Sequence, residues 1–320
     1  MRAKIVWVES HGDDLAYRPE FQVDSLESLR MTGVNTTDSK SSSKIMRLFF
    51  ILKFIVARIA LRARPIWSPP AVFGLRFRCL LNDAVGRTIY RHGIYEPHIL
   101  ACIQKNIRIE RGDLAIDIGA NIGWYSCIFS KMLEGRGLVI ALEPEPNNFT
   151  LLRQNVNFNR LDNVVTLERA ISDKKSTVLL HLYKASNRGR HSVLQIHDGP
   201  AKAVISSRLD DLLEDFGLQR SAIAILKIDV EGYEAIALRG ASRVLERSRL
   251  VIVEWSPDYM QRGGVAATEL ADILLKSGFE IFVIDSAGAA VAIDRDQLLA
   301  TKNQIDLVCI KTRDEMIDRD

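Results

Sequence analysis

The stretch LAIDIGANIGWYSCIFSKML, residues 114–133, decides the fold of this 320-residue chain. Its first five residues form an apolar run that is typical of a buried strand. Gly119 and Gly123 then permit a tight turn and a close approach of a ligand to the backbone, and residues 121–133 have helical character. A strand that enters a helix through such a turn predicts an α/β sheet, with a ligand site beyond the carboxyl end of the strand.

The chain from about residue 95 onward continues in the same alternating way. Strand-like and helix-like segments follow one another, which indicates a doubly wound, Rossmann-like domain with helices on both faces of its sheet. Two further strand-like runs, 176–184 and 202–209, flank a polar loop, and residues 233–248 are expected to form one helix. The strands expected in the main sheet are residues 114–119, 137–144, 163–172, 223–232, 249–256, 279–285 and 305–311.

The turn DIGANIG, residues 117–123, differs from a dinucleotide-binding turn. That turn carries G-x-G-x-x-G and presents a diphosphate to a helix N-terminus. Here the spacing is D-x-G-x-N-x-G, with Asn121 at the middle glycine position. Asp117, inside the strand, suits the cationic amino-acid end of S-adenosylmethionine better than it suits a diphosphate.

The end of the second strand supports this interpretation. Glu143 falls 20 residues after Gly123, where a carboxylate can accept hydrogen bonds from both ribose hydroxyls. Pro144 follows it and would form a rigid wall beside the adenine. The combination of the turn and a strand that ends in Glu-Pro predicts S-adenosyl-L-methionine as the cofactor.

Several sequence blocks, in order, resemble the FkbM family of methyltransferases. They are IDIGANIGWYS, EPEPNNFTLLRQNVNFN, RAISD, RLDDLL and KIDVEGYEAIALRGA, and they lie within residues 95–255. The resemblance implies a class I methyltransferase fold, normally a seven-stranded, mostly parallel sheet whose last strand is antiparallel. It also implies S-adenosyl-L-methionine as the methyl donor and, in many members, O-methylation of a sugar or natural-product hydroxyl.

The resemblance also implies roles for individual residues. Glu143 would bind the ribose, and the turn around Ala170 would contact the adenine edge. Arg208 departs from the family, whose members often have Thr at this place. The residues implied for the methionine end are Asp117, Gly119, Asn121 and Gly123.

The segment KIDVEG, residues 227–232, places three charged residues at the end of an otherwise apolar strand. An aliphatic hydroxyl is a weak nucleophile, so a positioned base should help to remove its proton. Asp229 is the leading candidate for orienting or deprotonating the acceptor, and Glu231 and Lys227 are second choices. The alternative is a structural one, in which Lys227 and an acid form a buried ion pair.

The polar loop SNRGRHSVLQIHDG, residues 186–199, holds further candidates for the acceptor site. His191 is one candidate base and His197 another, although a loop histidine is often a solvated residue. Arg188 and Arg190 would suit an anionic acceptor or would simply be solvated.

Composition limits the classes of partner. Lys and Arg number 43 against 40 Asp and Glu, a balance that predicts no nucleic-acid partner. The four cysteines form no CxxC pair, so we expect buried thiols and no zinc site. No ligand spacing predicts a metal. The first residues lack the features of a signal peptide. We therefore expect a cytoplasmic enzyme with a small-molecule or glycan acceptor.

The N-terminal part of the chain is expected to consist of two regions before the methyltransferase domain, residues 89–320. Residues 1–44 are polar and predict a flexible segment, and residues 45–88 predict a basic and apolar helical extension. The run 44–64 would lie on a membrane surface, at the inner membrane, or pack on the domain or on a second subunit of a homo-oligomer.

Two other functions compete with the methyltransferase. One is a nicotinamide-dependent oxidoreductase or epimerase, which the missing G-x-G-x-x-G disfavours. The other is a non-catalytic binding module that keeps the fold.

Overall fold

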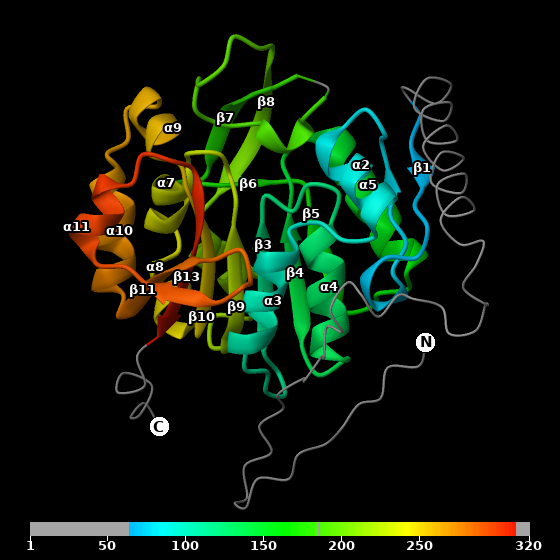
Figure 1. The fold of residues 1–320 in the computed structure, drawn as a ribbon, viewed down its shortest axis with the longest axis horizontal. Coiled ribbons are helices and arrows are strands. Elements are labelled where there is room, and N and C mark those ends of the chain that lie inside the picture. The colour runs from blue at the N-terminus through cyan, green and yellow to red at the C-terminus, as the bar shows by residue number, and fades with distance from the viewer. Residues whose placement is uncertain (1–63, 185, 312–320) are drawn as a thin grey trace, which may run out of the picture.

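The computed structural model describes residues 64–184 and 186–311, so the expected flexible segment 1–44 and nearly all of the run 44–64 lie outside the described residues. Among the described residues, no helix is both long enough and apolar enough to cross a bilayer. Figure 1 shows a central sheet with helices packed around it.

The central sheet has eight strands in the order β12-β11-β13-β10-β9-β3-β4-β5. The pairs β3–β4, β3–β9, β4–β5 and β9–β10 are parallel, whereas β13 runs antiparallel to both of its neighbours. This confirms the mostly parallel sheet with an antiparallel last strand. The eighth strand is the short edge strand β12. The strands are β3 (Leu114–Ile118), β4 (Leu138–Leu142), β5 (Val164–Leu167), β9 (Ile223–Ile228), β10 (Leu250–Trp255), β11 (Phe279–Ile284), β12 (Ala290–Ala292) and β13 (Ile305–Lys311).

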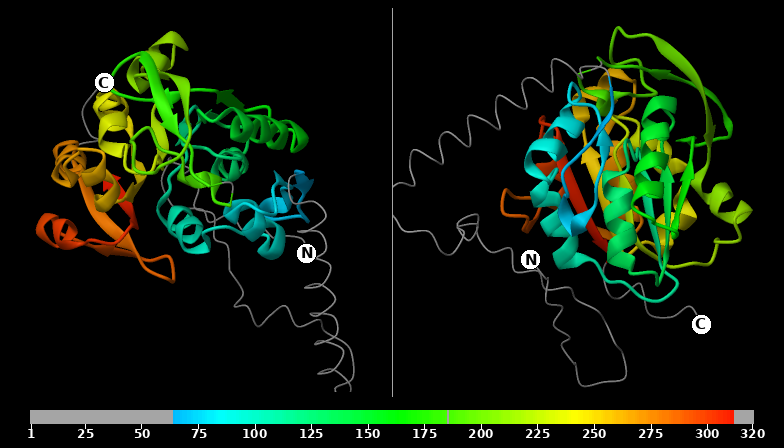
Figure 2. Two further views of the ribbon diagram at one scale, coloured as in Figure 1. Left: turned by 90° about the horizontal axis from the view of Figure 1, so that it is seen from above. Right: turned by 90° about the vertical axis from the view of Figure 1, so that its right-hand side faces the viewer.

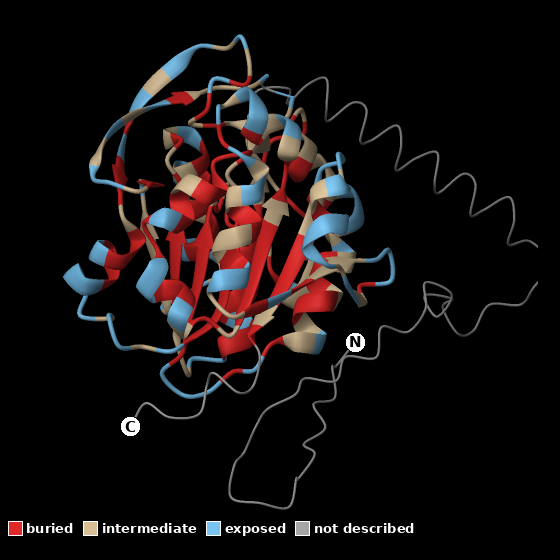
Figure 3. Cartoon of the chain, turned by 90° about the vertical axis from the view of Figure 1, so that its left-hand side faces the viewer, coloured by how far each residue is buried: buried red, intermediate tan, exposed pale blue. Residues whose placement is uncertain are grey.

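The two faces of this sheet bury separate apolar cores, because successive side chains of a strand point to opposite faces. In β3, Ile116 belongs to one core and Ala115 to the other. Figure 3 shows the buried strands between the layers of helices. One core receives α2 (Ala84–His92), α3 (Pro97–Asn106), α4 (Trp124–Leu133) and α5 (Pro146–Phe158). The other receives α6 (Leu209–Asp215), α7 (Glu234–Arg239), α8 (Ser242–Arg247), α9 (Pro257–Arg262), α10 (Ala267–Lys276) and α11 (Arg295–Ala300).

Residues 66–81 contribute Leu75, Phe77 and Cys79 to a core that also contains residues of the sheet, so these residues pack with the domain although they precede its expected start at residue 89. They form a small sheet of β1 (Ile66–Trp67) and β2 (Arg78–Cys79), joined by the 3-10 turn η1 (Val72–Gly74). Phe77 is fully buried and its ring packs 5.1 Å from that of Trp124. Figure 2 shows this segment lying against the helices of the domain.

Two expected elements are interrupted in the structure. The strand expected at 163–172 divides into β5 and β6 (Ala170–Ile171), which pair in different sheets. A second sheet, β6-β8-β7, contains β6, β7 (Ser176–His181) and β8 (Ala201–Ser207), and in Figure 1 β7 and β8 project past the end of the main sheet. The helix expected at 233–248 breaks at Gly240, where a Cβ would lie 2.1 Å from the Ser172 carbonyl oxygen. Asp210 then accepts hydrogen bonds from the first backbone N–H groups of α8.

All four cysteines are buried and free, as their apolar surroundings predict.

Candidate active site

Two adjoining hollows lie beyond the carboxyl ends of β3, β4 and β9. The first, here called the donor hollow, is lined by the ends of β3 and β4, by Ala170 and by His191. The second, here called the acidic hollow, has six acidic and two basic residues in its lining. Gly119 and Asp229 line both hollows. A ligand in one hollow therefore lies beside a ligand in the other.

The glycine turn after β3 is held by its backbone geometry. Gly119 has a φ of 80° and Gly123 a φ of 87°, a region that strongly favours glycine. A Cβ at Gly119 would lie 1.9 Å from the carbonyl oxygen of Asp229. Asn121 adopts the same left-handed region, with a φ of 51°. The turn therefore packs directly against the backbone that follows β9, and both glycines of the motif meet a steric requirement.

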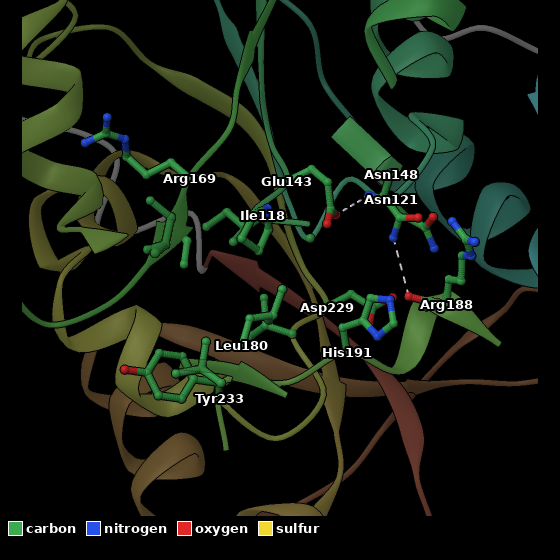
Figure 4. A pocket seen from close by; sticks show the side chains of 17 residues that line it. Ile118, Asn121, Glu143, Asn148, Arg169, Leu180, Arg188, His191, Asp229 and Tyr233 are labelled. Carbon is green, nitrogen blue, oxygen red and sulfur yellow. Dashed lines mark hydrogen bonds between the residues drawn. The ribbon is translucent and has the colours of Figure 1, made fainter. Parts of the chain in front are cut away.

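Glu143 supports this turn from the end of β4. Its buried carboxylate accepts hydrogen bonds from the backbone N–H of Asn121 at 2.8 Å and from that of Glu145 at 2.9 Å. Burial raises the pKa of Glu143 to about 8. Figure 4 shows its side chain directed toward Asn121, at the wall of the donor hollow. Pro144 lines the same hollow.

Asp117 lines only one of the two hollows, whereas Gly119 and Asn121 line both and Gly123 lines neither. It is buried and lines the acidic hollow, not the donor hollow. Its carboxylate accepts a hydrogen bond from the Ser126 hydroxyl at 2.5 Å. Burial raises the pKa of Asp117, while the positive charge of Lys227 opposes that rise.

The donor hollow fits a nucleoside cofactor with a polar end. The side-chain oxygens of Asn121 and Asn148 are buried there and have no hydrogen-bond partner among the described residues. Apolar walls come from Leu180 and Ile171. The unpaired oxygens suit the cationic end of a ligand, and the apolar walls suit a flat apolar ring.

Lys227 and Asp229 form an ion pair at 2.9 Å, so the structural alternative for KIDVEG is realised within the candidate site itself. Burial disfavours charge on Lys227, but Asp229, Glu96 and Asp117 outweigh it and raise the pKa of the amine. The Lys227 amine also lies 4.7 Å from the centre of the Tyr125 ring. The Asp229 side chain retains 31% exposure, compared with 4% for Lys227, so it is the member of the pair that a ligand can reach.

Glu231 follows at a φ of 55° and lines the acidic hollow. Its backbone oxygen accepts a hydrogen bond from the Ser192 hydroxyl at 2.9 Å, which ties the polar loop to this segment. Burial, together with the nearby charge of Asp229, raises the pKa of Glu231 to about 9.

The histidines of the polar loop have different surroundings. His191 lines the donor hollow, and its Nδ1 accepts a hydrogen bond from the Tyr183 backbone N–H at 2.9 Å. Burial lowers the pKa of His191 to about 4, so the ring is neutral at pH 7. His197 lines neither hollow and lies between the rings of Tyr183 and Tyr259. Arg188 lines the donor hollow and Arg190 the acidic hollow.

Three acids of the acidic hollow were not identified from the sequence. Glu254 lies in β10, Asp306 in β13, and Glu96 precedes α3. Burial raises the pKa of Asp306 to about 7 and that of Glu254 well above its usual range. The signal for Glu254 was an acid near the carboxyl end of an apolar strand, VIVEW, next to the strand that carries Lys227.

A sequence model described as the Methyltransferase FkbM domain matches residues 117–281 of this chain, slightly more than half of it. The chain belongs to the FkbM family of methyltransferases. Family membership favours a methyltransferase over a nicotinamide-dependent oxidoreductase or epimerase. The cofactor is S-adenosyl-L-methionine. The site residues fit this cofactor, since the glycine turn, Glu143 and the unpaired amide oxygens all border the donor hollow.

Curated relatives and one solved structure are similar to this FkbM-family chain. The hexuronic acid methyltransferase AglP of Haloferax volcanii is 28% identical over 145 residues, which cover 45% of this chain and 56% of AglP. The 2-O-methyltransferase NoeI of Sinorhizobium fredii is 25% identical over 204 residues, covering 58% and 82%. A structure of methyltransferase FkbM from Methylobacillus flagellatus aligns at 16% identity with a TM-score of 0.43, covering 69% of this chain and 49% of that one. The chain thus spans little more than half the length of AglP.

Proposed function

We propose that this protein methylates a hydroxyl group of a sugar, glycolipid or secondary metabolite, with S-adenosyl-L-methionine as the donor. The observation that carries the proposal is the shared wall of the two hollows, where Gly119 borders the donor side and Asp229 is accessible from both. The names of AglP and NoeI describe a hexuronic acid methyltransferase and a 2-O-methyltransferase, which supports a sugar hydroxyl as the acceptor.

The donor side of the site would be formed by the glycine turn and the end of β4. Gly119, Asn121 and Gly123 would hold the methionine end, Glu143 the ribose hydroxyls, and Pro144 with Ala170 the adenine; Asp117 would act on the methionine end from behind the turn. When bound, S-adenosyl-L-methionine supplies an electrophilic methyl group. The chain contributes by aligning the acceptor with that group, because alignment provides much of the acceleration of a displacement reaction.

The acceptor side would use Asp229. Its partly exposed carboxylate is held by Lys227 at 2.9 Å, which fixes its position at the shared wall. From there Asp229 would accept the proton that the acceptor hydroxyl loses. Glu231, whose pKa is raised to about 9, is the second candidate, for orienting the acceptor hydroxyl. His191 is neutral at pH 7 and lines the donor hollow, so it would form a hydrogen bond with the cofactor and not with the acceptor.

The test separates binding from chemistry. Asp229→Asn should bind S-adenosylhomocysteine as the wild-type protein does, measured by isothermal titration calorimetry, and should lose about 100-fold or more in turnover. The matched control is Asp162→Asn, since Asp162 is exposed and lines neither hollow. Turnover would be measured as release of S-adenosylhomocysteine from labelled donor in a screen of sugars and lipid-linked glycans.

Two outcomes would contradict the proposal. Wild-type turnover in Asp229→Asn would remove Asp229 from the reaction. Binding of the cofactor product without release of S-adenosylhomocysteine with any acceptor would favour the alternative of a non-catalytic binding module.

A further inference from the structure

The acidic hollow brings together carboxylates from two neighbouring strands. Asp229 and Glu231 follow β9, and Glu254 lies near the end of β10, which pairs with β9. One carboxylate oxygen from each of these three residues lies within 4.8 Å of the other two. Oxygens bound to one Mg²⁺ or Ca²⁺ ion at about 2.0–2.6 Å lie at most about 4–5 Å apart. The three side chains are therefore spaced as ligands of a single cation.

A second observation indicates that a ligand belongs here. Glu231 is only 6% exposed, and its Oε2 has no hydrogen-bond partner among the described residues. A buried carboxyl oxygen without a partner costs free energy, which a bound cation would offset. The indole N–H of Trp124 lines the same hollow, is 3% exposed as a residue, and is likewise without a partner within the described part of the chain. An N–H cannot bind a cation, but it can donate to an oxygen of an acceptor.

The charges that line the acidic hollow are unbalanced. The basic side chains there are Lys227 and Arg190. Lys227 already pairs with Asp229, and Arg190 has no ion pair within 4.0 Å among the described residues. The acids that line the hollow are Glu96, Asp117, Asp229, Glu231, Glu254 and Asp306.

An excess of carboxylates, with no histidine or cysteine among the residues that line the hollow, favours hard cations. Carboxylate and water oxygens suit Mg²⁺, Mn²⁺ and Ca²⁺, whereas imidazole and thiolate favour zinc and copper. Glu254 is already oriented, because Ser256 donates to its Oε2 at 2.8 Å and Gln304 donates to its other oxygen. Hydrogen bonds of this kind from neighbouring groups commonly fix a carboxylate ligand.

We propose that Asp229, Glu231 and Glu254 bind one hard divalent cation, and that this cation holds hydroxyl oxygens of the acceptor beside the glycine turn. The cation's role toward the acceptor rests on the proposed function, whereas its binding does not. The cation takes part in no bond-making step. It neutralises part of the acid excess and fixes the acceptor oxygens, so a polyhydroxylated acceptor with two neighbouring oxygens suits the site.

The test is Mn²⁺ binding to the full chain, followed by electron paramagnetic resonance. We expect one Mn²⁺ per chain, displaced by Mg²⁺ or Ca²⁺. Glu231→Gln and Glu254→Gln should each weaken Mn²⁺ binding by about tenfold or more, and the use of both keeps the test valid if one variant fails to fold. The matched control is Glu280→Gln, an exposed acid on β11 outside the hollow, which should bind Mn²⁺ as the wild type does.

A titration with S-adenosylhomocysteine in the same samples separates this proposal from the proposed function. Cofactor binding without Mn²⁺ binding at about 1 mM, a concentration at which weak carboxylate sites fill, would overturn the cation site and leave methyl transfer intact. Wild-type Mn²⁺ affinity in both hollow variants would also overturn it. Specific Mn²⁺ binding in a protein that does not bind the cofactor product would support the cation site and contradict the proposed function.

Discussion

Replacement of Gly119 by alanine tests the contact on which the site depends. Gly119 has a φ of 80°, and an added Cβ would lie 1.9 Å from the carbonyl oxygen and 3.0 Å from the carbonyl carbon of Asp229. Both of these are backbone atoms, so neither can rotate away. The same strand ends are joined by a hydrogen bond from the Asp229 N–H to the Ile118 oxygen at 3.1 Å. Relief of the clash would require β3 and β9 to separate where this bond is formed.

The magnitude follows from two contributions. An alanine in the left-handed region costs about 1–2 kcal/mol, and overpacking of a buried contact costs typically about 1–3 kcal/mol. Gly119→Ala should therefore lose about 2–5 kcal/mol of unfolding free energy. Gly135→Ala is the matched control, because Gly135 has a φ of 73° and nothing within 4 Å of its added Cβ. It should lose only about 1–2 kcal/mol.

Urea denaturation followed by circular dichroism measures both losses, and calorimetry measures the affinity for S-adenosylhomocysteine. We expect the affinity to fall by about tenfold or more in Gly119→Ala, equivalent to about 1.4 kcal/mol, and to stay unchanged in Gly135→Ala. Equal losses of stability in the two variants, with wild-type affinity in both, would refute the reasoning. In that case the close approach of the glycine turn to Asp229 would not constrain the site.

Three further predictions follow from other contacts. Glu143→Gln should raise the dissociation constant for S-adenosylhomocysteine about tenfold or more in calorimetry. The two backbone N–H groups bind different oxygens of the carboxylate, and glutamine replaces one of these oxygens by an NH2 group, which leaves one N–H unpaired; unchanged affinity would remove Glu143 from the donor site. Burial lowers the pKa of His191 from 6.5 to about 4 in the folded protein, because the folded state favours the neutral ring. The folded state therefore has its full stability above pH 6.5 and loses part of it as the pH falls toward 4. The loss amounts to at most about 3 kcal/mol. In urea titrations, the free energy of unfolding should differ less between pH 7.5 and pH 4.5 in His191→Gln than in the wild type, and identical differences would contradict this prediction. Asn155→Ala should lose about 2–4 kcal/mol in urea denaturation, because the buried amide accepts from the Arg78 N–H and donates to the Ile122 oxygen; a loss below about 0.5 kcal/mol would contradict this.

The sequence predicted those features that are determined locally. The turn after β3 was predicted because its signals lie within a few residues of one another. These signals are the apolar run that ends at Ile118 and the two glycines, Gly119 and Gly123. Glu143 was placed correctly at a strand end near this turn, because a parallel sheet brings the carboxyl ends of its strands to one edge. The hydrogen bond from the Asn121 N–H to Glu143 was not predicted.

Features that depend on contacts between distant segments were not predicted. At the break of the helix, Gly240 lies close to the backbone of Ser172, which is 68 residues earlier in the chain. The inclusion of residues 66–81 in the core depends on buried side chains such as Phe77 and on the hydrogen bonds of Asn155. Neither contact leaves a periodic pattern in the sequence, so local propensity alone gave a single helix and a separate extension.

The geometry divides the site into a part that is fixed and a part that can vary. The distance between the glycine turn and Asp229 is determined by a contact between the backbone of Gly119 and the backbone of Asp229. It therefore does not depend on the acceptor. The walls of the acidic hollow come instead from separate segments, namely the residues before α3, the polar loop and the start of β13. Glu96 there adopts a φ of 48° and accepts a hydrogen bond from the Tyr125 hydroxyl at 2.8 Å. Changes in these segments can therefore reshape the acidic hollow without moving the glycine turn, so the two parts of the site can vary independently.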